Sequence, residues 1–225
     1  MLKSQASSLI GGAVVVRRLF GALALLAVVL IGSASPAAAA GGFTLFGDAT
    51  RVHPGNNSHT AIQLRSIGAG FGGIDFKVPS GLTFADVQNL ATDYNFTAAS
   101  CGLGSPRFQV NVDGKNAFVY IGPPPNYVGC AQNVWVSTGN LATSASFVDT
   151  SQLPGGTFYD NFGPADVKYG SHSVTGIQLV ADAGFSFGTQ TVLVDNVMIN
   201  NTTYTFDRHG NAEGDDENGD EGGGD

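Results

Sequence analysis

Charged residues are scarce in this sequence, and one charged type is missing from most of it. The 225 residues carry 18 acidic and 10 basic side chains, and no glutamate occurs before Glu213. Clustered lysines and arginines are absent, which argues against a nucleic-acid-binding domain, because such domains neutralise backbone phosphates with a basic patch. An acidic chain with few lysines is also expected to bind anionic membranes poorly.

The residue patterns of the common catalytic sites are missing as well. The aspartates between the chain ends are scattered and suggest no local pair of the kind that glycoside hydrolysis requires. There is no G-x-S-x-G nucleophile motif, and His53 and His59 lack the spacing of a zinc-binding helix. The sequence therefore favours a protein that is not an enzyme, and a hydrolase is the last of three functional hypotheses.

Cysteine is limited to Cys101 and Cys130. In an exported chain an isolated pair predicts a disulfide. A catalytic cysteine is the alternative, but it would need a thiolate kept reduced and a histidine partner, and neither cysteine lies in a recognisable signature.

The first 40 residues have the pattern of a secretory signal peptide. Arg17 and Arg18 supply positive charge, an uncharged apolar run covers 19–31, and three alanines at 38–40 form a small-residue cleavage site. The apolar run is too short for a comfortable membrane span. We therefore expect a secreted or cell-surface protein with no membrane span after cleavage, exported by the Sec route or, given the paired arginines, by the twin-arginine route.

The chain from Gly41 onward is rich in Gly, Thr, Ser, Asn, Val and Phe, a composition typical of β-structure. Short alternating segments recur between turn residues, and Asp113-Gly114 between two of them predicts a tight hairpin. Helical spacing after Thr83 predicts one short helix. The expected fold is an all-β, antiparallel sandwich of jelly-roll type over 41–206.

The residues from Asp207 to Asp225 form a separate acidic segment. They contain eight acidic side chains and one arginine. A segment of this composition cannot bury enough apolar surface to offset the entropy of ordering, so we expect a disordered tail over 207–225. A calcium-binding tract is the alternative, but the EF-hand spacing is absent.

A ligand site is predicted around the sole tryptophan. In a strand through Asn133 and Ser137, Trp135 shares the face of these polar residues if the neighbouring valines face the core. A proline-rich loop at 122–127 ends in Tyr127 and follows Tyr120. We predict a sugar-binding surface from Trp135, Tyr127, Tyr120 and Asn133; the alternative is a Trp135 buried beneath the loop.

Asp195 interrupts an otherwise apolar strand and needs a partner. Calcium is one option, with Asp48 as a second oxygen ligand. Hydrogen bonds from backbone amides of a neighbouring turn are the other option. No further cofactor is expected.

Several stretches together resemble exported, uncharacterised bacterial proteins with a jelly-roll domain. The resemblance covers roughly 43–206 and rests on Gly73-Ile74-Asp75-Phe76, Leu82-Thr83-Phe84, Ser105-Pro106-Arg107-Phe108, Val119-Tyr120-Ile121-Gly122-Pro123-Pro124, Thr138-Gly139-Asn140-Leu141 and Gln190-Thr191-Val192-Leu193-Val194-Asp195-Asn196-Val197. The last stretch is also similar to the final strand of sandwiches of the carbohydrate-binding-module type. The resemblance implies a fold more than a function.

Two further hypotheses remain beside the hydrolase. The first is a secreted, non-enzymatic module that binds glycan or cell-wall polysaccharide. The second is an extracytoplasmic structural or protein-interaction domain without a small ligand. The oligomeric state stays open.

Overall fold

The computed structural model describes residues 37–38 and 42–207. Most of the predicted signal peptide and the predicted acidic tail beyond Asp207 lie outside the described residues. No helix within the described ranges is long and apolar enough to cross a membrane.

The first sheet is built around the eleven-residue strand β13, Thr189–Ile199. Strand β13 pairs antiparallel with three neighbours, and β9 and β3 extend the sheet outward. The short strand β1 joins β14 in parallel. The remaining strands of this sheet are β1 (Ala37–Ala38), β3 (Ala49–Val52), β4 (Ala61–Ile67), β6 (Leu90–Ala98), β9 (Val136–Ser137) and β14 (Thr202–Tyr204).

The second sheet has five antiparallel strands in the order β2-β5-β12-β7-β8. Their bounds are β2 (Phe43–Gly47), β5 (Gly72–Phe76), β7 (Arg107–Val112), β8 (Lys115–Tyr120) and β12 (Val174–Ala181). A small separate pair follows, β10 (Phe147–Val148) with β11 (Asp160–Asn161).

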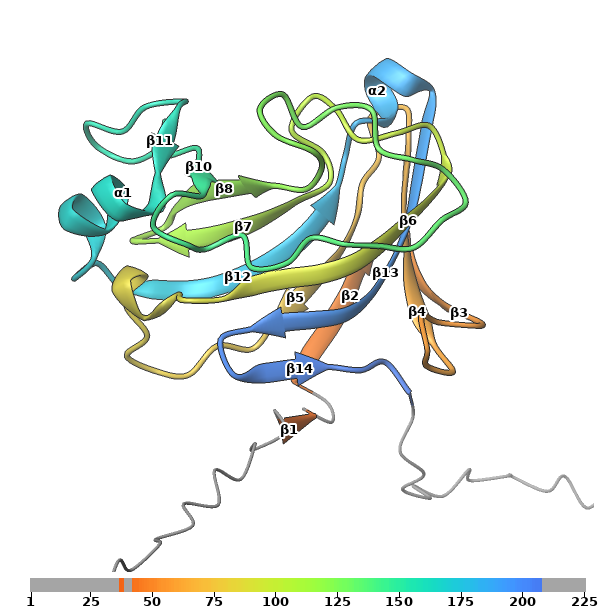
Figure 1. The fold of residues 1–225 in the computed structure, drawn as a ribbon, viewed down its shortest axis with the longest axis horizontal. Coiled ribbons are helices and arrows are strands. Elements are labelled where there is room, and N and C mark those ends of the chain that lie inside the picture. Colours follow the sequence, from red (N-terminus) through yellow and green to blue (C-terminus); the bar gives the residue numbers. More distant parts are fainter. Residues whose placement is uncertain (1–36, 39–41, 208–225) are drawn as a thin grey trace, which may run out of the picture. The chain divides into compact units, whose positions relative to one another are not determined.

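The two sheets pack face to face as a jelly-roll sandwich (Figure 1). One sheet contains the order β4-β13-β6-β9 and the other the order β5-β12-β7-β8, which is the strand order of a jelly roll. Within these eight strands the chain crosses between the sheets at every connection except the β7–β8 hairpin. Alternate residues of each strand point inward and form one core. The predicted antiparallel sandwich is confirmed. The largest fully buried side chains are Phe76, Phe84, Phe96, Phe108, Phe206, Ile62, Leu64, Ile74, Leu90, Ile121, Ile177 and Leu179.

The predicted hairpin is present, whereas the predicted helix is shorter than expected. Asp113 and Gly114 both have positive φ, 48° and 79°, as a tight turn between β7 and β8 requires. After Thr83 there is only a single 3-10 turn, η1 (Phe84–Asp86). The chain then extends, because Leu90 pairs with Ile199 in the sheet. The described helices are α1 (Phe162–Tyr169) and α2 (Gly184–Phe187).

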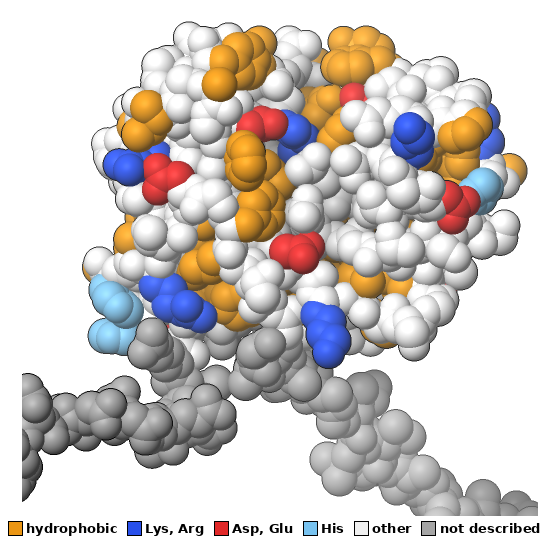
Figure 2. All heavy atoms as spheres, turned by 180° about the vertical axis from the view of Figure 1, so that it is seen from behind, with side chains coloured by type: hydrophobic (Ala, Val, Ile, Leu, Met, Phe, Trp, Pro, Cys, Tyr) orange, Lys and Arg blue, Asp and Glu red, His pale blue; other side chains and the backbone are white. Residues whose placement is uncertain are grey.

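Acidic and basic side chains are interspersed on the face seen in Figure 2, with small groups of hydrophobic side chains between them. Two ion pairs join opposite charges directly. Arg107 donates to both carboxylate oxygens of Asp182 at 2.7 Å, and Arg65 donates to Asp48 at 2.6 Å. The face seen in Figure 2, where red and blue side chains alternate, presents no extended field of one sign.

Candidate binding groove

A groove with a volume of about 1020 Å³ opens where edge strand β8 of one sheet and edge strand β9 of the other lie along the same side of the sandwich. The proline-rich loop after β8 forms one wall, and the segments around β10 and β11 form another. Its lining residues are Tyr94, Val119, Tyr120, Gly122, Pro123, Pro124, Pro125, Asn126, Tyr127, Gly129, Cys130, Ala131, Val136, Ser137, Thr138, Leu141, Thr143, Ala145, Ser146, Phe147, Tyr159 and Asn161.

Aromatic rings gather on the β8 side of this groove. The ring of Tyr127 lies 5.9 Å from that of Tyr120 and 5.4 Å from that of Phe147, centroid to centroid. Phe147 in turn lies 5.6 Å from Tyr159, and Phe158 packs against Tyr159 at 4.8 Å. We call these five residues the aromatic cluster. Its rings hold one another at separations typical of stable aromatic pairs, so the groove wall is ordered before any ligand arrives.

Tyr120 is fixed within the cluster by a buried carboxylate. Its hydroxyl donates a 2.6 Å hydrogen bond to Asp149, which is only 2% exposed. Burial, followed by the hydrogen bond to Asp149 and the charge of that carboxylate, raises the pKa of the Tyr120 phenol. Tyr120 therefore stays protonated at physiological pH and keeps its ring in one orientation against the groove.

The proline-rich loop is attached to the sandwich by the disulfide between Cys101 and Cys130, as predicted. Gly122 lies directly against this disulfide with φ of 137°, and a Cβ there would approach the Cys101 sulfur to 2.8 Å. Only glycine fits both the backbone angle and the close approach. The loop that carries Tyr127 is thus anchored at its start and at its end.

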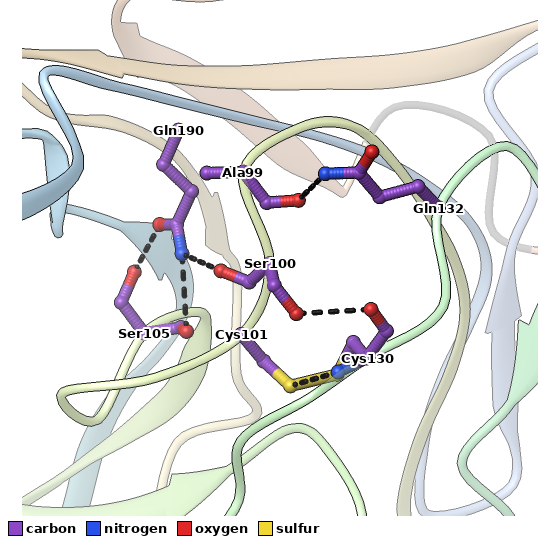
Figure 3. The surroundings of a disulfide bond; sticks show 7 residues. All are labelled: Ala99, Ser100, Cys101, Ser105, Cys130, Gln132 and Gln190. Carbon is purple, nitrogen blue, oxygen red and sulfur yellow. Dashed lines mark hydrogen bonds between the residues drawn. A yellow bond between two sulfur atoms is a disulfide. The ribbon is translucent and has the colours of Figure 1, made fainter.

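Hydrogen bonds around the disulfide extend this anchor into the first sheet (Figure 3). The Gln190 amide of β13 accepts from the Ser105 hydroxyl at 2.6 Å and donates to the Ser100 carbonyl at 2.9 Å. The Ser100 hydroxyl donates to the Cys130 carbonyl at 2.9 Å. Gln190 is fully buried, so this network positions the disulfide relative to the core.

The structure brings together two of the four residues predicted to bind sugar. Tyr120 and Tyr127 line the groove, whereas Trp135 and Asn133 are not among its lining residues. The expected strand alternation does not hold here, because Asn133 has a φ of 57° and the strand contains only Val136 and Ser137. Val134 is 46% exposed rather than facing the core, and Trp135 is partly buried.

Sequence reasoning missed Phe147, Phe158 and Tyr159. The signal was present, because Phe158-Tyr159 is an adjacent aromatic pair in a Gly- and Thr-rich connection, and Tyr159 is 76% exposed. Aromatic residues in a polar loop are candidates for ligand contacts. Their gathering near Tyr127 could not be foreseen, since about 20 to 30 residues separate them from Tyr127 along the chain.

Asp195 lies at a break in the pairing of β13 and is fully buried. Its carboxylate accepts hydrogen bonds from the Asn56 N–H at 2.7 Å, the Ser58 hydroxyl at 2.5 Å and the Asn196 N–H at 2.7 Å. The neighbouring turn approaches so closely that a Cβ on Gly55 would lie 2.5 Å from this carboxylate. The hydrogen-bonding alternative to calcium is therefore present in the structure.

The structure gives Asp48 and Asp195 separate partners. Asp48 pairs with Arg65, while Asp195 binds the turn that contains Asn56 and Ser58. Among the described residues no group of three or more His, Cys, Asp or Glu side chains is placed to hold a metal ion. Calcium binding at Asp195 stays a prediction, and its test is given in the Discussion.

The buried position of Asp195 predicts a pH dependence of stability. Burial raises the pKa of Asp195 above its ordinary value of 3.8, in opposition to its hydrogen bonds. The folded state therefore binds a proton that the unfolded state does not, at pH values between 3.8 and the raised folded pKa. Across this window the stability of the wild type relative to Asp195→Asn should rise as pH falls. Denaturant titrations of both proteins at a series of pH values from neutral downward measure this difference. If the free energies of unfolding of the two proteins change with pH in the same way, the prediction is wrong.

Comparison with known proteins gives one structural likeness. No family model matches the sequence, and no curated protein matches it. The structure is similar to the family 11 carbohydrate-binding module of the cellulosomal cellulase Lic26A-Cel5E of Clostridium thermocellum, with 10% sequence identity and a TM-score of 0.43. The match covers 79% of this chain and 96% of that module. At this degree of similarity the match identifies no ligand and no binding residue.

Proposed function

We propose that this protein is a secreted, non-enzymatic module that binds glycan in the groove. The observation that carries the proposal is the aromatic cluster. All of its rings except that of Phe158 line a groove of about 1020 Å³, and they are held by mutual contacts, by Asp149 and by the disulfide-anchored loop. Pre-ordered aromatic side chains suit shallow sugar sites, because little conformational freedom is left to lose on binding.

The groove offers both kinds of contact that a sugar needs. The rings of Tyr127 and Tyr159 present apolar faces on which the C–H face of a pyranose can pack. Hydroxyl and amide groups on other walls can exchange hydrogen bonds with sugar hydroxyls. These groups belong to Asn126, Ser137, Thr138, Thr143, Ser146 and Asn161.

Export fits the same proposal. The disulfide is of the kind that persists in oxidising compartments, and the first 40 residues have the pattern of a signal peptide. The natural ligand would then be a polymer at the cell surface or in the surrounding medium. Export by the Sec or the twin-arginine route is equally consistent with this location.

The remaining two hypotheses rest on other features. A hydrolase would need two carboxylates facing a substrate, and no Asp or Glu is among the groove's lining residues. A protein-interaction domain has one observation in its favour, a set of exposed apolar side chains around α2 and the nearby loops. These include Phe185, Leu103 and Phe71, which are 66%, 60% and 50% exposed.

Substitution of two groove tyrosines tests the proposal. Tyr127→Ala and Tyr159→Ala in the full exported chain should each weaken glycan binding by about 1–3 kcal/mol, the loss typical of a truncated aromatic anchor. Binding is measured by a glycan array followed by calorimetry with the best ligand. Both variants should keep the wild-type melting temperature within a few degrees, because Tyr127 is only half-buried and Tyr159 is largely exposed.

Phe185→Ala is the matched control, since it also truncates an exposed aromatic ring but lies outside the groove lining. It should bind like the wild type. Trp135→Ala tests the sequence-based assignment separately. If the wild type binds no glycan, or if Phe185→Ala loses as much affinity as Tyr127→Ala, the proposed site is wrong.

A further inference from the structure

The lining of the groove contains no Asp, Glu, Lys, Arg or His. This is notable in a chain with 18 acidic and 10 basic residues. The polar groups that reach the groove are neutral hydroxyls and amides, and the rest of the wall is aromatic, proline or aliphatic. A ligand bound here would meet no ionised side chain of either sign among the described lining residues.

Asp149 and Asp160, which are close in sequence to the lining residues Phe147, Tyr159 and Asn161, accept hydrogen bonds from groups of the protein itself. Asp149 accepts from the Tyr120 hydroxyl at 2.6 Å and from the Ser151 N–H at 2.9 Å. Asp160 accepts from the Thr150 hydroxyl at 3.1 Å and from the Asn161 N–H at 2.9 Å. Their negative charges are therefore used to hold the wall in place.

Three of the four tyrosines in the groove lining have phenols with a raised pKa. Burial raises the pKa of Tyr94 and of Tyr127, and the pKa of Tyr120 is raised by burial and by Asp149. All three phenols are neutral at physiological pH. The groove is thus a neutral surface within an acidic protein.

We infer that the ligand of this groove is an uncharged polysaccharide chain, an inference that rests on the proposed function. An ionised group entering the groove would give up water and find no opposite charge, which is costly. A uronate, sulfate or phosphate group would also meet the field of a protein with net charge −8. A neutral sugar has no ionised group to desolvate and is not repelled by the acidic protein. Its hydroxyls exchange hydrogen bonds with the hydroxyl and amide groups of the groove, and its C–H face packs on the rings.

Polymers that share one backbone but differ in charge separate these cases. Affinity electrophoresis and calorimetry with the full exported chain would use hydroxyethylcellulose, carboxymethylcellulose and a quaternised hydroxyethylcellulose. Dextran, dextran sulfate and diethylaminoethyl-dextran form a second series, and neutral mannan and xylan extend the panel. We expect binding to at least one neutral polymer that is at least about tenfold tighter than to its charged derivatives at about 0.15 M salt. That binding should change less than about twofold when the salt is raised to about 0.5 M.

Asn126→Lys provides a gain-of-function control, because Asn126 is an exposed residue of the groove lining where a lysine side chain can reach the ligand. This variant should acquire salt-sensitive binding to the anionic derivative of the preferred polymer, which the wild type binds weakly. Adding Tyr127→Ala to the wild type or to Asn126→Lys should weaken binding of the neutral polymer in each case.

The outcomes distinguish the two proposals. Salt-dependent binding of the wild type to a charged polymer, lost in Tyr127→Ala, would overturn the neutral-ligand inference and leave glycan binding intact. Absence of binding to every polymer in the panel and on the array would overturn both. Tight, salt-insensitive and Tyr127-dependent binding to a neutral polymer supports both.

Discussion

Replacing both disulfide cysteines by serine, Cys101→Ser with Cys130→Ser, should lower the free energy of unfolding by about 3 kcal/mol. The cross-link spans 29 residues of sequence, and closing a loop of that size restricts the unfolded chain by about this amount. For a domain of this size the melting temperature should fall by roughly 6–12 °C. Calorimetry of the exported protein and of the double variant measures the effect.

The same variant should bind glycan more weakly even where it is fully folded. Without the disulfide, the loop that carries Tyr127 loses its attachment at Cys130, and ordering that loop becomes part of the cost of binding. Ser100→Ala is the control, because it removes only the hydrogen bond to the Cys130 carbonyl and leaves the cross-link. A double variant with wild-type melting temperature and wild-type affinity would show that the disulfide supports neither the fold nor the groove.

Asp195→Ala should also destabilise the protein by about 3 kcal/mol. The substitution leaves the N–H groups of Asn56 and Asn196 and the hydroxyl of Ser58 without their acceptor at a fully buried position, and each unsatisfied buried group is costly. Asp48→Ala is the matched control. The Asp48 and Arg65 side chains are 37% and 43% exposed, and a surface pair of this kind contributes about 0–1 kcal/mol. Equal losses in the two variants would contradict the special role of the buried carboxylate.

A chelator arm in the same experiment tests the calcium prediction. If a calcium ion is held at Asp195, chelation should lower the melting temperature of the wild type, because a ligand of the folded state stabilises it by mass action. Asp195→Ala should abolish that response, while Asp48→Ala reports whether Asp48 takes part. A wild type whose melting temperature is the same with chelator and with added calcium would leave hydrogen bonding from the Asn56 turn as the whole explanation.

Strand positions and the sandwich were predictable because they follow from local patterns. Recurring short alternating segments predicted an antiparallel sheet structure, which the strands confirm, and the Asp113-Gly114 turn is encoded by two residues that tolerate positive φ. The helix after Thr83 was predicted too long. Phe84, Val87 and Leu90 are buried as their spacing suggested, but sheet pairing at Leu90 outweighs the weak helical preference of so short a segment.

The set of side chains that line the groove was only partly predictable. Tyr120 and Tyr127 were identified because the proline-rich loop connects them directly. Trp135 was assigned by extending a regular strand through Asn133, and the left-handed backbone at that residue breaks the alternation. The ring of Phe147 meets that of Tyr127, and the ring of Tyr159 meets that of Phe147, only through the tertiary fold.

The sequence alone therefore determined the features that depend on neighbouring residues or on composition: the all-β class, the hairpin, the cysteine pair and the need of Asp195 for a partner. The tertiary structure alone decided which partners the Asp195 carboxylate has and which aromatic residues share a groove. It also decided that the groove lining contains no Asp, Glu, Lys, Arg or His. The physical reason is that strand alternation and turn chemistry act over a few residues. The groove instead arises where the edges of two sheets meet, from side chains that lie up to 67 positions apart, from Tyr94 to Asn161.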